Sequence, residues 1–144
     1  MPVLEMNAAD RRQVTVDYFK RFDAGRDVLD LFDDDVYVYF PKHAPAHNLE
    51  EVRQLFTDVG SLFKNIVHEV AYFNYVIEGE RVVVEGITRG SLADGGTWRA
   101  GESLGGRFCN VFEIRDEKIQ RLHIYLDPDY GDRDVDRYPW LAGA

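Results

Sequence analysis

Hydrophobic positions follow a helical period in the N-terminal part of the chain. Apolar side chains recur near every third or fourth position from Val14 to Phe22, a spacing that predicts an amphipathic helix. Asn7 can cap the start of this helix, and Gly25 suits the left-handed stop that ends many helices. The first element is therefore expected to be a helix ending near the segment Asp23-Ala24-Gly25.

Three more elements are expected before the pattern changes. Residues 27–32 predict a short helix, and Val36–Phe40, rich in β-branched and aromatic residues, predicts a strand. The acidic run Asp33–Asp35 between them is interpreted as a solvated turn. An apolar stripe from Leu49 to Phe63 with a period of 3.6 predicts a longer helix, which Asn48 can cap.

From His68 onward the period becomes two, as expected for strands with one buried face. The runs His68–Glu78 and Arg81–Ser91 are separated by Gly79-Glu80, a two-residue hairpin signal. Two further runs, Arg107–Ile114 and Lys118–Leu126, predict the last two strands after a glycine-rich loop.

Helices followed by antiparallel strands predict an α+β domain. A long antiparallel sheet must twist, and helices laid across its concave side leave a pocket at one end. We expect a single domain over residues 1–144, with a core of about 8–127 and a C-terminal tail at 128–144.

Composition narrows the possible partners. The chain has 144 residues with 17 Lys+Arg against 26 Asp+Glu, a formal net charge of −9. Nucleic acid and anionic membranes are disfavoured, because phosphate contacts need clustered cations. The first residues have no basic and apolar signal-peptide pattern, and no stretch approaches the roughly 20 apolar residues of a membrane span. These features favour a cytoplasmic protein.

Common cofactor and metal motifs are absent from the sequence. There is no dinucleotide fingerprint, phosphate-binding loop or serine-hydrolase elbow. His43 and His47 have the spacing of a helical zinc pair, but Pro45 breaks any helix that would align them. We therefore expect neither a metal nor a cofactor.

The last two strands carry the candidate chemistry. Side chains two residues apart share a face of a strand, so His123, Tyr125 and Asp127 lie together. In the preceding strand Phe108 and Asn110 share a face. If these faces line the pocket, they supply a carboxylate, an imidazole, a phenol and a carboxamide, a set suited to proton transfer.

The opposite face of the last strand would then be apolar and exposed. It carries Leu122, Ile124 and Leu126. Such a strip needs a cover, so we expect a homodimer through the sheet.

The chain resembles the nuclear transport factor 2-like superfamily, in particular its SnoaL-like branch. The resemblance runs from Asp10 to about Asp127 and rests on the order of elements and on local sequence. The matching segments are Tyr18-Phe-Lys-Arg-Phe-Asp-Ala-Gly25, Leu31-Phe-Asp-Asp-Asp-Val36, Ile77-Glu-Gly-Glu-Arg-Val-Val-Val84, Phe112-Glu-Ile-Arg-Asp-Glu-Lys-Ile119 and Tyr125-Leu-Asp127. The resemblance implies a cone-shaped, curved antiparallel sheet wrapped by helices around an apolar pocket. It implies no single activity, because the superfamily includes isomerases, cyclases, dehydratases, epoxide hydrolases and non-catalytic modules.

Residue-by-residue comparison assigns expected roles to three residues. Tyr18 and Asn110 stand where ketosteroid isomerases place their oxyanion-hole donors, whereas Phe40 replaces the isomerase base. Asp127 matches the aspartate that ends the last strand of SnoaL-like polyketide cyclases and resembles their acid/base group. The Arg-x-Asp pair of limonene-epoxide-hydrolase-like proteins is missing; Glu85 is the only carboxylate nearby.

The sequence therefore predicts a cofactor-independent enzyme of the isomerase, cyclase or dehydratase type. Its substrate would be a small hydrophobic carbonyl compound. Asp127 would move a proton with help from His123, while Tyr18 and Asn110 stabilise an enolate. The expected pocket-lining residues are Phe40, Phe108, Tyr125 and Trp98. The alternatives are a non-catalytic ligand-binding or protein-interaction module and an epoxide-hydrolase-like enzyme. His68 could pair with His123 in a dehydratase.

Overall fold

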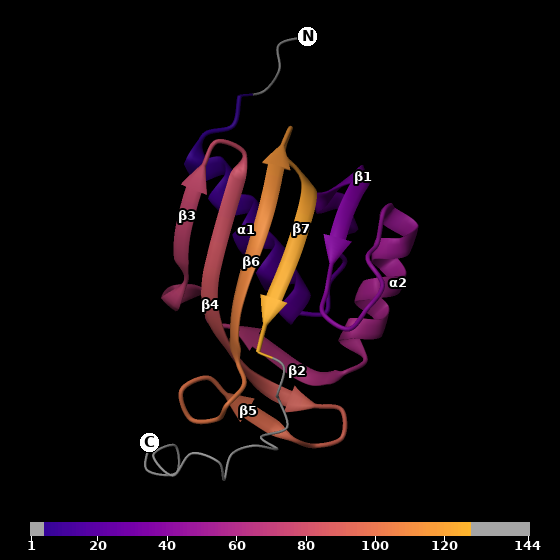
Figure 1. Ribbon diagram of the computed structural model, residues 1–144, viewed down its shortest axis with the longest axis vertical. Helices are drawn as coiled ribbons and strands as arrows, with labels where there is room; N and C mark the ends of the chain where they lie inside the picture. Colours follow the sequence, from indigo (N-terminus) through magenta and orange to yellow (C-terminus); the bar gives the residue numbers. More distant parts are fainter. Residues whose placement is uncertain (1–4, 128–144) are drawn as a thin grey trace.

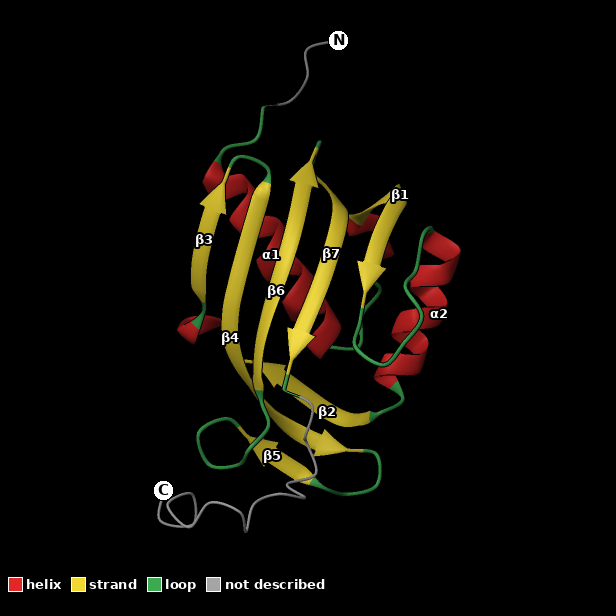
Figure 2. Cartoon of the chain, viewed as in Figure 1, coloured by secondary structure: helices red, strands yellow, loops and turns green. Residues whose placement is uncertain are grey.

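The computed structural model describes residues 5–127, in which two α-helices lie against one face of a curved, unclosed seven-stranded sheet (Figures 1 and 2). Figure 1 looks onto the outer face of the sheet, and α1 crosses behind it. The expected α+β class and curved sheet are confirmed. The expected tail, 128–144, lies outside the described residues.

Both helices begin at the predicted asparagine caps. The side chain of Asn7 accepts a hydrogen bond from the Asp10 N–H, and the Asp10 carboxylate accepts one from Asn7 N–H, so α1 (Ala8–Asp23) opens with a capping box. Asn48 caps α2 (Leu49–Gly60), which buries Val52 and Val59 against the sheet side. None of the described helices has the length and apolar composition needed to cross a bilayer.

The sheet has the order β1-β7-β6-β4-β2, and β3 and β5 also pair with β4. All pairs are antiparallel except β1 with β7, which is parallel, so the sheet is mixed at this edge. The strands are β1 (Phe32–Tyr39), β2 (Phe63–His68), β3 (Asn74–Glu78), β4 (Arg81–Leu92), β5 (Thr97–Arg99), β6 (Arg107–Arg115) and β7 (Lys118–Leu126).

Three boundaries differ from the sequence prediction. The expected short helix shrinks to the 3₁₀ turn η1 (Leu29–Leu31), and Asp33–Asp35 belong to β1 rather than to a turn. The register of β1 shifts between Phe32 and Tyr37, an irregularity in which Asp33 accepts a hydrogen bond from Asp35 N–H. The expected strand from His68 to Glu78 is two strands, β2 and β3, separated by the 3₁₀ turn η2 (Val70–Tyr72).

The core lies between the helices and the inner face of the sheet. Along β6 the inner positions Phe108, Asn110 and Phe112 are buried, whereas their neighbours are only partly so. Along β7 the inner positions are Leu122, Ile124 and Leu126. These three residues pack into the core and are not an exposed strip, so they cannot form the dimer face expected from the sequence.

Candidate active site

A small enclosed cavity lies between the inner face of the sheet and the two helices. Its volume is about 30 Å³, enough for one or two water molecules. Its polar side chains are Tyr18, His68, Thr88 and Asn110. Its walls include Phe22, Phe40, Phe56, Phe63, Phe108 and Ile124. We call this space the inner cavity.

Asp23, the last residue of α1, holds His68, the last residue of β2, at two points. One carboxylate oxygen lies 2.6 Å from His68 Nδ1, and the other accepts the His68 backbone N–H at 2.7 Å. Both side chains are largely buried, with 17% and 11% of their surface exposed. The carboxylate fixes the proton on Nδ1, so Nε2 is the nitrogen left to accept or deliver a proton.

Aromatic rings surround the His68 imidazole. Its centroid lies 4.8 Å from that of Phe19 and 5.1 Å from that of Phe108. Among the described residues, Nε2 makes no hydrogen bond. An oriented imidazole in an apolar wall is a group that can exchange a proton with a bound molecule.

Tyr18 lies in α1 one and a half turns before Asp23. Burial, reinforced by the negative charge of Asp23, raises the pKa of the Tyr18 hydroxyl above its usual value. The phenol therefore stays protonated at any physiological pH. It can donate a hydrogen bond to an oxygen atom that becomes negative.

Asn110 occupies the middle of β6, opposite Ile124 of β7 and Val84 of β4. It is 2% exposed, and its side-chain Oδ1 has no hydrogen-bond partner among the described residues. A buried amide without a partner costs stability, of the order of 1–3 kcal/mol. An asparagine at this position therefore lowers the stability of the fold.

Thr88 and Trp98 have structural partners. The Thr88 hydroxyl donates to Gly106 O and accepts from Trp98 Nε1, both at 3.0 Å. Trp98, in β5, is buried outside the inner cavity, although the sequence placed it among the pocket residues. Phe40 and Phe108, from the same group, do line the cavity.

The other expected catalytic residues lie on the opposite face of the sheet. Because β7 turns Leu122 and Ile124 inward, the alternating positions His123 and Tyr125 point outward, and Asp127 follows them at the strand end. The carboxylate of Asp127 accepts the Arg107 N–H at 3.1 Å. Four polar groups do not converge as the sequence analysis expected: Tyr18 and Asn110 reach the inner cavity, whereas His123 and Asp127 do not.

His123 belongs to an aromatic group on the outer face. Its ring meets those of Tyr37 and Tyr39 edge to face at 5.3 and 5.6 Å. Burial lowers the pKa of His123, and the nearby Arg121 lowers it further. His123 is therefore not the partner of His68, and the histidine pair considered for a dehydratase does not form.

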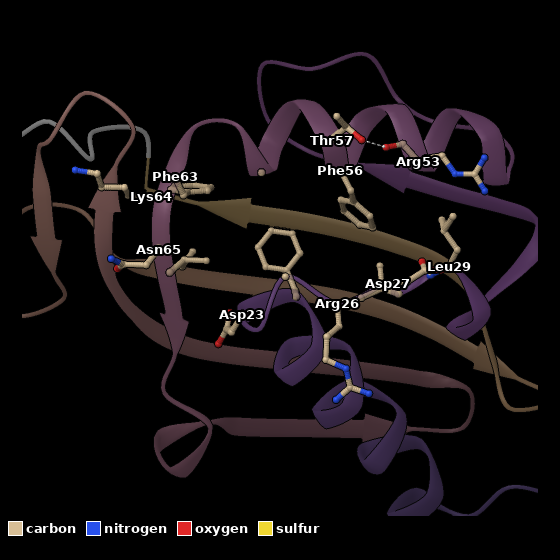
Figure 3. Close-up of a pocket in the computed structure, with 15 residues that line it drawn as sticks. Asp23, Arg26, Asp27, Leu29, Arg53, Phe56, Thr57, Phe63, Lys64 and Asn65 are labelled. Carbon is tan, nitrogen blue, oxygen red and sulfur yellow. Dashed lines mark hydrogen bonds between the residues drawn. The ribbon is translucent and has the colours of Figure 1, made fainter.

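A larger pocket adjoins the inner cavity (Figure 3). It has a volume of about 440 Å³ and is formed by residues of three segments, 22–29, 53–60 and 63–66. We call it the entrance pocket. Phe22, Phe56, Phe63 and Ile66 line both spaces, so these side chains form the wall between them.

The pairing of Asp23 with His68 is the feature that sequence reasoning missed. Asp23 stands in a helix-ending segment and His68 at the start of an expected strand, 45 residues later. Neither position has a local motif. The one signal was the aromatic surroundings of both residues, which place a titratable pair inside an apolar region.

Comparison with known proteins identifies the domain type. Residues 15–122 match the family model of the SnoaL-like domain. Among proteins with curated descriptions, none matches this sequence.

Solved structures share the fold at low identity. An NTF2-like protein from Anabaena variabilis is 20% identical, covers 90% of this chain and 98% of its own, and has a TM-score of 0.71. A candidate polyketide cyclase from Xanthomonas campestris is 16% identical over 85% of this chain and 93% of its own, with a TM-score of 0.71. TerC, crystallised with polyporic acid, is 15% identical over 94% of this chain and 99% of its own, with a TM-score of 0.67.

Proposed function

Since the chain belongs to the SnoaL-like domain family, within the NTF2-like superfamily, we propose that it is a cofactor-independent acid/base enzyme. Its substrate is a small, largely apolar carbonyl compound, and His68 is the group that moves the proton. One observation carries the proposal. An imidazole oriented by a buried carboxylate faces the same cavity as the Tyr18 phenol and the buried Asn110 amide.

The proposed reaction begins at a carbon next to the substrate carbonyl. His68 Nε2 takes a proton from this carbon, and the bonding electrons move to the carbonyl oxygen to give an enolate. Asp23 stabilises the imidazolium that results, while Tyr18 and Asn110 donate hydrogen bonds to the enolate oxygen. Return of the proton to another carbon isomerises the substrate; attack of the enolate carbon on a second carbonyl cyclises it; loss of a β-hydroxyl as water dehydrates it.

Deuterium exchange tests this proposal without knowledge of the natural substrate. A panel from aryl ketones to β-diketones is incubated with the protein in D₂O, and loss of the α-proton signal is followed by NMR. We expect the wild type to accelerate exchange on at least one probe and His68→Gln to reduce that rate by about 10²–10⁴-fold. His47→Gln, at an exposed histidine, is the matched control. Equal exchange by wild type and His68→Gln across the panel would refute the proposal.

A non-catalytic ligand-binding function is the second candidate, and the size of the inner cavity favours it. A space of about 30 Å³ does not admit a substrate unless the wall formed by Phe22 and Phe56 moves. A ligand held in the entrance pocket alone would not reach His68. TerC, a protein of the same fold, was crystallised with polyporic acid. The epoxide-hydrolase alternative would use a different site, because Glu85 and Asp127 line a separate hollow of about 470 Å³ that does not include His68.

We also propose that two copies of the chain pair through the outer face of the sheet. This face includes the aromatic group around His123, and it exposes 50% of Tyr125 on β7 and 65% of Val76 on β3. Large apolar side chains exposed on the same face of the sheet favour a self-complementary contact. The proposed dimer contact is therefore on the opposite face of the sheet from the one expected from the sequence.

A further inference from the structure

Three cationic side chains surround the entrance pocket. Arg26 comes from the loop after α1, Arg53 from α2 and Lys64 from β2. Figure 3 shows them on three different sides of Phe56. The chain as a whole carries 17 basic against 26 acidic residues, so this grouping runs against the net charge of −9.

Two of the three cations have no acidic partner. Among the residues that the structure describes, neither Arg26 nor Lys64 makes an ion pair or a side-chain hydrogen bond. Arg53 contacts Glu50 at 3.1 Å, but both side chains are exposed. These groups therefore remain available to a ligand.

Both carboxylates that line the pocket accept hydrogen bonds from the protein. Asp23 uses both oxygens to bind His68, and one oxygen of Asp27 accepts the Leu29 N–H at 2.9 Å. The floor between the cations is apolar, with Phe22 and Phe56 packed at a ring separation of 5.9 Å. The entrance pocket thus combines a cationic rim with an aromatic floor.

We propose that the molecule bound here is an amphipathic carboxylate. Its acid group stays at the rim, beside either Arg26 or Lys64, and its apolar part lies on Phe22 and Phe56. This inference rests on the proposed function and names the substrate class: the reacting carbonyl is carried on the apolar part toward His68, while the acid remains in water. Exposed cations contribute about two- to five-fold each to affinity, and their contribution falls with salt.

A matched pair of probes tests the carboxylate directly. Binding of 2-naphthoate and of 2-naphthylmethanol, which share a ring system and differ in charge, is measured by calorimetry in about 25 and about 300 mM NaCl. We expect the acid to bind about tenfold more tightly at low salt, with the preference shrinking at high salt. The double variant Arg26→Gln, Lys64→Gln should lose most of the preference and keep its affinity for the alcohol.

The control variant makes the same change in net charge at positions outside the entrance pocket. Arg99→Gln, Arg115→Gln removes two exposed cations that do not line the pocket. It should retain the preference for the acid. No preference in the wild type, including failure to bind either probe, overturns the inference, and so does an equal loss in the control variant.

The proposed enzyme and the proposed ligand class can fail separately. His68→Gln should keep the preference for 2-naphthoate over 2-naphthylmethanol, because the cations that produce this preference lie at the rim. If the protein prefers 2-naphthoate but shows no His68-dependent deuterium exchange, the proposed enzymatic activity is refuted and the protein is a carboxylate-binding protein. Exchange on neutral ketones without acid preference would overturn the carboxylate alone.

Discussion

Asp23 and His68 close the end of α1 onto the end of β2 through two hydrogen bonds, at 2.6 and 2.7 Å. Removing the carboxylate leaves a partly buried backbone N–H and a ring nitrogen without partners. We expect Asp23→Ala to lower the free energy of unfolding by about 1–3 kcal/mol, measured by urea denaturation. Asp27→Ala, which removes one exposed hydrogen bond to Leu29, should cost about 1 kcal/mol or less. Equal losses in the two variants would argue against a special role for the pair.

Asn110 should show a conflict between stability and function. Its amide oxygen is buried without a partner, so Asn110→Leu removes a desolvated polar group and fills the same space with an apolar one. We expect the melting temperature to stay the same or rise, while α-proton exchange falls by about ten-fold or more. A large loss of stability with exchange unchanged would instead make Asn110 a structural residue.

Gly86 of β4 leaves room for the ring of Phe108. A Cβ added at Gly86 would lie 2.7 Å from Phe108 and 2.8 Å from Phe73, both packed among other aromatic side chains. We expect Gly86→Ala to cost about 1–3 kcal/mol of unfolding free energy through overpacking. Gly60→Ala meets open space at the end of α2 and should be neutral or slightly stabilising in the same denaturation series.

His123 should make stability depend on pH. Burial and Arg121 lower its pKa in the folded protein, and Glu113 opposes them in part. The unfolded chain therefore takes up this proton first, so the contribution is complete above the unfolded pKa of about 6.5 and is lost as pH falls toward the folded value. Urea denaturation between about pH 5 and 8 should show a shallower slope below pH 6.5 in His123→Gln than in the wild type. Parallel profiles would show that another group is responsible.

Tyr125 tests the proposed pairing of two chains. It is half exposed on the outer face, beside Tyr39 at a ring separation of 6.1 Å. We expect Tyr125→Glu to convert a dimer into a monomer in light scattering after size exclusion, because each chain would bring a charge into the apolar contact. Leu62→Glu, at an exposed apolar residue after α2, is the control and should leave the dimer intact. A monomeric wild type would contradict the pairing outright.

Periodicity predicted which side chains share a face, but it did not decide which face points inward. His123 and Tyr125 do lie together, as their spacing required. They were expected to line the pocket because an imidazole, a phenol and a carboxylate on one face suit proton transfer. The aliphatic Leu122 and Ile124 were the better guide, since burial of apolar surface dominates the choice of face.

Contacts between residues distant in sequence account for the features that were not predicted. The caps at Asn7 and Asn48 and the strands β4, β6 and β7 are local features, and all were predictable. The pairing of Asp23 with His68 depends on how α1 crosses the sheet, and the parallel pairing of β1 with β7 depends on a long connection. Neither arrangement has a sequence pattern of its own.

The side chains of β7 serve two separate parts of the molecule, the interior and the outer face. In the second half of β7, an inward position such as Ile124, which lines the inner cavity, can be changed without altering the outer face. The outward positions His123 and Tyr125 can gain or lose an association without changing the inner cavity. Residues that shape the cavity and residues that would mediate association can therefore change independently, although they are neighbours in one strand.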